Sequence, residues 1–257
     1  MNDDINIRAL PGIPDIRPGD DLAQILLAAL DRARVALHPG DILAVAQKIV
    51  SKAEGRLLRL DEIEPGAEAR RLAEAVAKDP RKVEVILRES RRIVRAVKRP
   101  HQKEGVLIAE HRLGFVCANA AVDESNVGDE GTVILLPEDP DRSARALAAA
   151  LERACGAPVG VVITDTFGRP WRMGLVNVAV GVANVPAVVD LAGGRDAYGR
   201  PLSVTAPALA DEIAAASGLV MTKSGKKPVV LFRGIDWEAC DDSAQALVRP
   251  QEEDLFR

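Results

Sequence analysis

Aromatic residues make up only 3% of the 257-residue sequence, and its formal net charge is −4. Nucleic-acid-binding proteins usually combine a basic surface with aromatic side chains on which bases stack. Since the sequence has neither property, we expect no nucleic acid partner.

Cysteine is also scarce, with three residues at wide spacings and no CxxC pair. Such a pattern provides neither a disulfide framework nor a zinc site, so we expect reduced, structural thiols and a cytoplasmic protein. The first four residues lack basic character and no apolar segment follows them, so no signal peptide is predicted. The longest apolar segment, Leu175–Leu191, contains several polar residues and is shorter than the about 20 residues that a membrane span requires. We therefore expect no membrane association.

Two standard nucleotide-binding fingerprints are missing. The sequence contains no GxxxxGK[ST] and no GxGxxG after its first predicted strand. A nucleotide would therefore have to be held by other groups. An aspartyl phosphate enzyme is also disfavoured, because Phe167 stands two residues after Asp165, where a second aspartate would be needed.

A chain of this length can bury roughly three quarters of its unfolded surface, enough for one large domain or two small ones. Periodicity predicts helices over residues 21–37, 67–77, 81–91, 141–154 and 206–216. Residues 5–14 alternate loosely and predict a strand that runs into Pro- and Gly-rich turns. Apolar runs predict further strands over residues 42–46, 106–109, 115–118, 133–136, 159–163, 176–182 and 229–232. Strands follow strands as often as helices, which favours an α+β fold with mixed sheets over a doubly wound parallel sheet. We treat residues 1–257 as one functional unit that could have two lobes.

Four residues offer hard oxygen ligands suited to Mg²⁺ or Mn²⁺: Asp165 and Thr166 after a predicted strand, and Asp123 and Asn126 in another loop. Two carboxylates about 4 Å apart repel by about 4 kcal/mol at an effective dielectric near 20. If the loops converge, a cation or a raised pKa must therefore offset the repulsion. The alternative is that these residues only cap turns and strand ends.

Basic residues suggest anion binding at two places. Lys48 and Lys52 would share one face of a helix and could hold phosphate, or could simply be solvated. Arg169 and Arg172 could bind phosphate or carboxylate oxygens, or could pair with Asp165. The Arg and Lys residues of the predicted helices between residues 67 and 91 are expected to form solvated faces. The histidines have no cysteine or acid at metal-ligand spacing, and we assign none of them to catalysis.

Several long blocks in order resemble the coenzyme F420:L-glutamate ligase family, in its form without a C-terminal nitroreductase-like domain. The resemblance covers nearly the whole chain. It is carried by GIP at residues 12–14, QKIVSKAEGR at 47–56, GFVCANAAVDESN at 114–126, LLPEDPD at 135–141, DTFGRPWR at 165–172 and ADEIA at 210–214.

The resemblance implies a family-specific mixed fold, an intertwined homodimer, GTP as the nucleotide, and two divalent cations (Mg²⁺ or Mn²⁺), with K⁺ as an optional activator. The implied reaction transfers the γ-phosphoryl group of GTP to the terminal carboxylate of coenzyme F420-0. The α-amine of L-glutamate then displaces phosphate, and further γ-linked glutamates can follow. Two alternatives stay open: an amide ligase with a different acceptor carboxylate, and a nucleotide-binding regulatory partner without chemistry.

The resemblance also implies roles for single residues. Asp123 and Asp165 correspond to ligands of the first metal and Thr166 to a ligand of the second, and Asp123, Asp165 and Lys52 are the expected catalytic residues. The residues implied to contact GTP are Ile13, Pro14, Asp15, Ile16, Gln47, Lys48, Lys52 and Asn126. We add Arg169 and Arg172 as binders of a substrate carboxylate or phosphate.

One departure from the family pattern concerns the second metal. Some members place an acidic or amide ligand within the segment that reads Met221-Thr222-Lys223-Ser224 here. A charged lysine cannot ligate a cation, so the sequence leaves the second metal site incomplete.

Overall fold

The computed structural model describes residues 4–222 and 224–254. Its strands are β1 Asn6–Ala9, β2 Ile42–Ala46, β3 Leu57–Arg59, β4 Ser90–Val97, β5 Val106–His111, β6 Val116–Ala118, β7 Thr132–Ile134, β8 Gly160–Arg169, β9 Arg172–Ala183 and β10 Val229–Arg233. Its α-helices are α1 Leu22–Arg32, α2 Gln47–Ala53, α3 Ala67–Val76, α4 Pro80–Arg88, α5 Pro140–Cys155 and α6 Leu209–Met221. Short 3₁₀ helices span Leu60–Glu62, Asn119–Ala121, Ala244–Leu247 and Gln251–Glu253.

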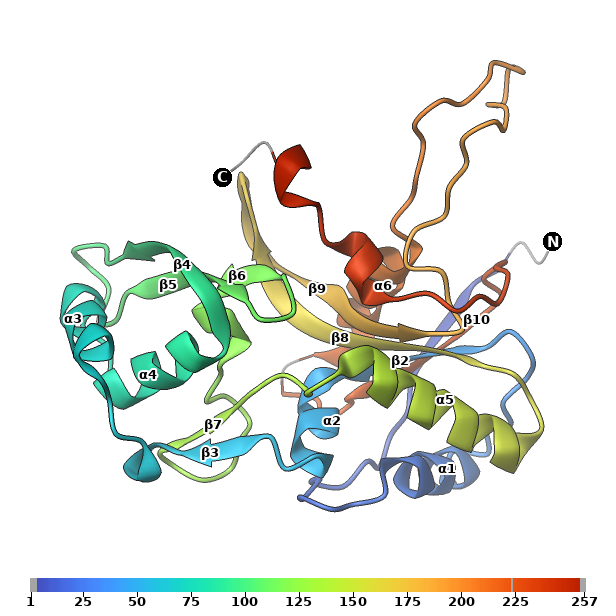
Figure 1. The fold of residues 1–257 in the computed structure, drawn as a ribbon. Helices are drawn as coiled ribbons and strands as arrows, with labels where there is room; N and C mark the ends of the chain where they lie inside the picture. Colours follow the sequence, from blue (N-terminus) through green and yellow to red (C-terminus); the bar gives the residue numbers. More distant parts are fainter. Residues whose placement is uncertain (1–3, 223, 255–257) are drawn as a thin grey trace.

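The central element is a five-stranded mixed sheet with the order β1-β10-β2-β8-β9 (Figure 1). Within the described residues β2 and β8 form a parallel pair, and the other neighbours in this sheet are antiparallel. Helices α1 and α5 lie on one side of the sheet, and α6 lies on the other (Figure 1). The predicted α+β fold with mixed sheets and flanking helices is confirmed.

A second group of elements forms its own core. The three-stranded sheet β4-β5-β6 is antiparallel and packs against α3 and α4. Its buried apolar side chains form a cluster separate from the one on the five-stranded sheet, and include Leu72, Val83, Ile86 and Leu107. We call these two units the large lobe and the small lobe. The β3–β7 ladder lies between them (Figure 1).

Sequence patterns explain where the helices begin and end. Asp139 caps α5 by accepting a hydrogen bond from the Arg142 backbone N–H at 2.9 Å, and Pro140 occupies the first turn. The helix ends at Gly156, which adopts a left-handed conformation with φ 66°. Between these ends, Ala144, Leu147 and Leu151 face the sheet. None of the helices within the described ranges is both long and apolar enough to cross a membrane.

Three predicted helices have wrong ends. The helix predicted over residues 206–216 begins at Leu209 and continues to Met221. The helix predicted over residues 21–37 ends at Arg32, because Arg34 is left-handed (φ 52°) and Leu37 enters the core from an extended segment. The helix predicted over residues 81–91 ends at Arg88, because Ser90 already pairs with His111 in the β4–β5 ladder.

The expectation that the basic residues of these helices are solvated is wrong for Lys82. This side chain is only 10% exposed and pairs with Glu124 at 2.5 Å. Its ion pair links α4 to the loop that follows Asp123. A lysine that the sequence pattern places on a solvated face therefore belongs to the contact between two segments far apart in the chain.

Strand β8 is longer than predicted. Apolar residues predict a strand that stops at Ile163, yet β8 continues to Arg169 and turns into β9 at Pro170 and Trp171. Pairing with β2 stops at Thr164, so the rest of β8 is paired only with β9. Asp165 therefore lies within a strand, at the first residue beyond the parallel pair.

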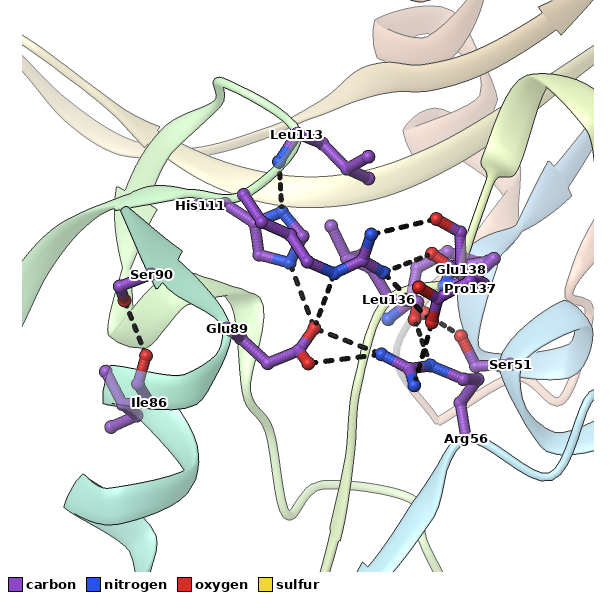
Figure 2. A network of polar contacts seen from close by, with 12 residues as sticks. Ser51, Arg56, Ile86, Glu89, Ser90, His111, Leu113, Leu136, Pro137 and Glu138 are labelled. Atoms are coloured by element: carbon purple, nitrogen blue, oxygen red, sulfur yellow. Dashed lines mark hydrogen bonds and ion pairs between the residues drawn. The ribbon is translucent and has the colours of Figure 1, made fainter. Parts of the chain in front are cut away.

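A polar network centred on Glu89 joins the small lobe to the large one (Figure 2). The Glu89 carboxylate accepts hydrogen bonds from Arg56 Nη2 at 3.2 and 3.1 Å and from Arg112 Nε at 3.2 Å. The same arginines donate to backbone carbonyls before α5, Arg56 Nε to Leu136 and Arg112 Nη1 to Glu138, both at 3.0 Å. The network thus fixes the end of α4 against the segments that follow α2 and precede α5.

His111 completes this network from the interior. Its Nδ1 accepts a hydrogen bond from the Leu113 N–H at 3.0 Å, so the ring hydrogen sits on Nε2. Nε2 lies 3.4 Å from Glu89 Oε2, within ion-pair distance but without normal hydrogen-bond geometry. Burial acts to raise the pKa of Glu89, but His111, Arg56 and Arg112 together lower this pKa to about 2.

We predict that Glu89→Gln lowers the free energy of unfolding by about 2 kcal/mol at pH 7, because two partly buried arginines lose their counter-charge. The folded-state pKa of Glu89 is about 2 and its ordinary value is 4.5. The stabilisation is therefore complete above pH 4.5 and is lost as the pH falls toward 2. Urea unfolding of both proteins at pH 7 and pH 3 measures this difference.

Glu138→Gln is the matched control, since the Glu138 side chain is 60% exposed and its pairs should contribute less than about 1 kcal/mol. A Glu89→Gln effect of equal size at both pH values would contradict the assignment of the low pKa to Glu89.

Candidate functional site

Several of the residues predicted to carry chemistry lie near the carboxyl ends of the parallel strands β2 and β8. Strand β2 passes directly into α2 at Gln47, and Asp165 follows the last β8 residue paired with β2. Asp123 arrives from the β7 side, where its backbone N–H donates to Ile134 O at 3.2 Å and its carbonyl accepts from the Ile134 N–H at 2.8 Å. Ends of neighbouring parallel strands are common positions for ligand sites.

The Asp123 carboxylate is held by its own loop and by α2. Oδ1 accepts hydrogen bonds from the backbone N–H groups of Glu124 (2.7 Å) and Ser125 (2.9 Å). Oδ2 accepts from Ser125 Oγ at 2.7 Å and from Lys48 Nζ at 2.6 Å. Burial acts to raise the pKa of Asp123, but Lys48 and Ser125 lower this pKa to about 2.

Lys48 is surrounded by oxygen atoms. Its Nζ donates to Asp123 Oδ2 at 2.6 Å, to the Ser125 carbonyl at 2.7 Å and to Ser125 Oγ at 2.6 Å. An ammonium group has three N–H donors, so these contacts use all of them. The loop at Asp123 therefore forms an oxygen-lined place for a cation, and the lysine ammonium occupies it.

Asp165 belongs to the same charged group. Burial raises the pKa of Asp165 to about 6, and the negative charge of Asp123 adds to the rise. The backbone N–H of Thr166 and the charge of Lys48 act in the opposite direction. The structure thus brings together the two carboxylates expected to hold the first metal, and a single ammonium neutralises only part of their charge.

Gln47 is buried beside Asp165. Its side-chain oxygen Oε1 accepts a hydrogen bond from Ser51 Oγ at 2.7 Å, whereas Nε2 is among the buried polar atoms of the described residues that lack a partner. The Gln47 amide nevertheless lowers the pKa of Asp165. It therefore faces that carboxylate without a hydrogen bond of normal geometry.

Thr166 lies on the opposite face of β8 from Asp165. Its Oγ1 donates to Asn177 Oδ1 on β9 at 2.9 Å, and Asn177 in turn contacts α6. Successive strand residues alternate between faces, so Asp165 points toward Lys48 while Thr166 points toward the α6 side. The side chains of Asp123, Asp165 and Thr166 therefore do not converge on one point. Within the ranges that the structure describes, no cluster of three His, Cys, Asp or Glu residues suits a metal.

The residues expected to contact GTP lie around α2. Lys52 follows Lys48 by one turn, as predicted for a helix. The segment Ile13–Ile16 buries Ile13 and Ile16 in the same cluster as the apolar face of α2, whereas Pro14 and Asp15 are exposed. Asn126 is exposed in the Asp123 loop, with a left-handed backbone (φ 59°) that asparagine tolerates.

Arg169 and Arg172 lie apart from this group. They face each other across the β8–β9 hairpin, where Arg169 Nη2 donates to Met173 O at 3.2 Å. Arg169 is four residues beyond Asp165, which corresponds to roughly 13 Å along a strand. None of the ion pairs in the described part of the chain joins either arginine to Asp165. Lys223, the departure noted at the second metal, lies outside the described residues.

Comparison with known proteins identifies the family. Residues 12–234 match the F420-0:gamma-glutamyl ligase family. The chain belongs to this family. It is 48% identical to the coenzyme F420:L-glutamate ligase of Methanopyrus kandleri, over 98% of both chains. It is 44% identical to the protein of the same name from Methanothermobacter thermautotrophicus, over 98% of this chain and 99% of the other. The protein is therefore a ligase, as the resemblance predicts.

Sequence reasoning missed three participants in this region. Ser125 stands inside a quoted motif, but its double contact with Lys48 depends on a long-range approach. Asn177 is a polar residue within the apolar stretch 175–183 of β9, and this interruption is a signal that the sequence does carry. The Lys82–Glu124 pair has no sequence signal, because 42 residues separate its members.

We predict that Lys48→Met raises the pKa of Asp123 from about 2 toward its ordinary value of 3.8, because its ammonium partner is lost. The pKa of Asp165 should rise further above 6 for the same reason. Carbon-13 NMR titration of labelled aspartates in the metal-free protein measures both. Lys52→Met, one helical turn away, is the control and should leave both values in place. Unchanged Asp123 titration in Lys48→Met would refute the contact.

Proposed function

We propose that this ligase joins the terminal carboxylate of coenzyme F420-0 to the α-amine of L-glutamate at the expense of GTP, in coenzyme F420 biosynthesis. The observation that carries the proposal is the group formed by Asp123, Lys48 and Asp165, in a chain that matches relatives of that name over nearly its full length. Coenzyme F420-0, L-glutamate and GTP are the small-molecule substrates in this reading.

The donor set suits a divalent cation. Asp123 and Asp165 supply carboxylate oxygens, the ligands that Mg²⁺ and Mn²⁺ prefer, and their charge exceeds that of Lys48. These two residues would hold the first ion, and Thr166 would contribute to a second; K⁺ would be an activator. A divalent cation at this place polarises phosphoryl oxygens and neutralises the charge that develops during transfer.

The protein residues would bind and orient the nucleotide. Lys48, Lys52 and Gln47 present two charges and an open amide from one short helix, and Asn126 and Ile13–Ile16 flank them. The carboxylate of F420-0 attacks the γ-phosphorus of GTP and GDP leaves. The amine of glutamate then attacks the acyl carbon, phosphate leaves and an amide forms. Additional rounds would add γ-linked glutamates.

The decisive assay incubates the purified protein with F420-0, L-glutamate, GTP and Mn²⁺ and follows product mass. We predict an increase of one or more glutamate residues. Asp123→Asn and Asp165→Asn should each reduce the rate by at least about a hundredfold, because each removes a charge expected to bind the metal while keeping the side-chain shape. Omission of Mn²⁺ should have the same effect as either substitution.

Each other outcome points to a different function. Metal-dependent phosphate release with another carboxylic acid, but not with F420-0, would identify an amide ligase with a different acceptor. Nucleotide binding without phosphate release on any carboxylate would indicate a regulatory partner. Full activity of both aspartate variants would remove the assigned metal site.

The β8–β9 hairpin suggests how two copies associate. Its apolar side chains Trp171, Met173 and Leu175 are 85%, 94% and 60% exposed. Contiguous exposed apolar side chains are typical of protein interfaces. We propose that this hairpin contacts a second copy of the chain in a homodimer.

We predict that Met173→Ser combined with Leu175→Ser shifts the protein from dimer toward monomer in analytical ultracentrifugation, because apolar interface area is lost. Ile5→Ser is the control, since Ile5 is 59% exposed but lies next to β1 at the other edge of the sheet. A wild-type protein that is monomeric at all concentrations would exclude the homodimer.

A further inference from the structure

Thr166 and Asn177 bring two oxygen atoms together on the α6 side of the hairpin. The residues are directly paired in the β8–β9 ladder, and Thr166 Oγ1 lies 2.9 Å from Asn177 Oδ1. Asn177 is a polar residue within the mostly apolar strand β9. Thr166 is exposed and Asn177 is partly buried, so this oxygen pair lies at the surface of the lobe.

The hydrogen bonds around α6 determine which way the Asn177 amide points. Ser217 is buried, and its hydroxyl donates its one hydrogen to the Ala214 carbonyl at 2.6 Å. Ser217 Oγ can therefore only accept from Asn177, which places Nδ2 at 3.2 Å from Oγ. With Nδ2 fixed toward α6, Oδ1 must face Thr166.

Helix α6 also leaves room for this amide. A Cβ atom at Gly218 would lie 3.4 Å from Asn177 Nδ2 and 3.7 Å from its Cγ, so a larger residue would crowd the side chain. Met221 Sδ lies 4.0 Å from Nδ2 on the same helix. The amide is thus held on its nitrogen side, and its oxygen is presented outward.

We propose that Asn177 Oδ1 is a protein ligand of the second divalent cation, beside Thr166 Oγ1. This inference rests on the proposed function, and it supplies the amide ligand that the sequence leaves missing at Lys223. Mg²⁺ binds oxygen at about 2.0–2.1 Å in octahedral geometry, so adjacent ligands lie about 2.8–3.0 Å apart. The two oxygens, which share a hydrogen bond in this structure, are 2.9 Å apart and so could occupy adjacent positions around the ion without a change in their separation.

The charge of the two protein oxygens determines which further ligands the second ion requires. Both protein oxygens are neutral, so phosphate oxygens and water would have to supply the remaining ligands and the negative charge that balances the cation. The carboxylates of Asp123 and Asp165 lie with Lys48, on the other face of β8. The second ion therefore depends on nucleotide more strongly than the first.

The test counts Mn²⁺ bound by the full chain, with and without a non-hydrolysable GTP analogue, from the electron paramagnetic resonance signal of free Mn²⁺. We expect the wild type to bind two ions with the analogue, and Asn177→Leu to bind one. Asn177→Asp keeps the shape and adds a negative charge, so it should bind the second ion at least about tenfold more tightly. Asp123→Asn should lose the first ion.

Ser217→Ala serves as a positioning control, because it frees the amide without removing its oxygen and should weaken only the second ion. Retention of the first ion shows that each Asn177 variant is folded. The inference would be overturned if both Asn177 variants bound two Mn²⁺ ions with unchanged affinity, or if the wild type bound only one. Either result would leave the proposed function intact. Absence of any Mn²⁺ or nucleotide binding by the wild type would overturn both.

Discussion

The contact between Lys48 and Asp123 is the interaction on which the candidate site depends. Lys48 belongs to α2, which begins where β2 of the large lobe ends, and Asp123 is tied through its backbone to β7. Val133 in β7 packs in the small-lobe cluster, so the 2.6 Å ion pair connects the two cores. Asp123 and Asp165 are 42 residues apart in the chain and come from opposite sides of the lobe boundary. Their carboxylates lie close together only because the Asp123 loop of one lobe contacts α2 of the other.

The Glu89 network is a second set of contacts that holds the two lobes together. Arg56 follows α2 by three residues and meets Glu89 of the small lobe, so one short segment contributes cations to both contacts. Buried ion pairs add little net stability compared with apolar packing, but an uncompensated buried charge is costly. A displacement of the lobes would separate Arg56 from Glu89, and Arg112 from the carbonyl groups of Pro137 and Glu138. The network therefore favours one relative position of the lobes more than it adds to total stability.

The sequence predicts those parts of the fold that depend on local pattern. The strand predicted over residues 42–46 matches β2 at both ends. The prediction that Lys48 and Lys52 lie one turn apart on a helix is also confirmed. Prediction from the sequence fails where pairing with a distant segment determines the structure. The mostly polar segment 164–169 indicates a loop, yet pairing with β9 makes it a strand. Strand geometry then directs Asp165 and Thr166 to opposite faces. Burial of Lys82 and the open amide of Gln47 likewise depend on neighbours that no local pattern specifies.

The donor count at Lys48 links metal and nucleotide binding in the proposed reaction. All three N–H groups of Lys48 are used by Asp123 and Ser125, so a phosphate oxygen can accept a hydrogen bond from this lysine only after one contact breaks. Breaking it in the absence of another cation would leave the half-buried Asp123 carboxylate unneutralised beside Asp165. In the proposed reaction, a divalent ion held by Asp123 would remove this cost, and Lys48 would then be able to donate to phosphate. Metal binding would therefore precede the contact between Lys48 and the nucleotide, and the excess negative charge of Asp123 and Asp165 supports this order.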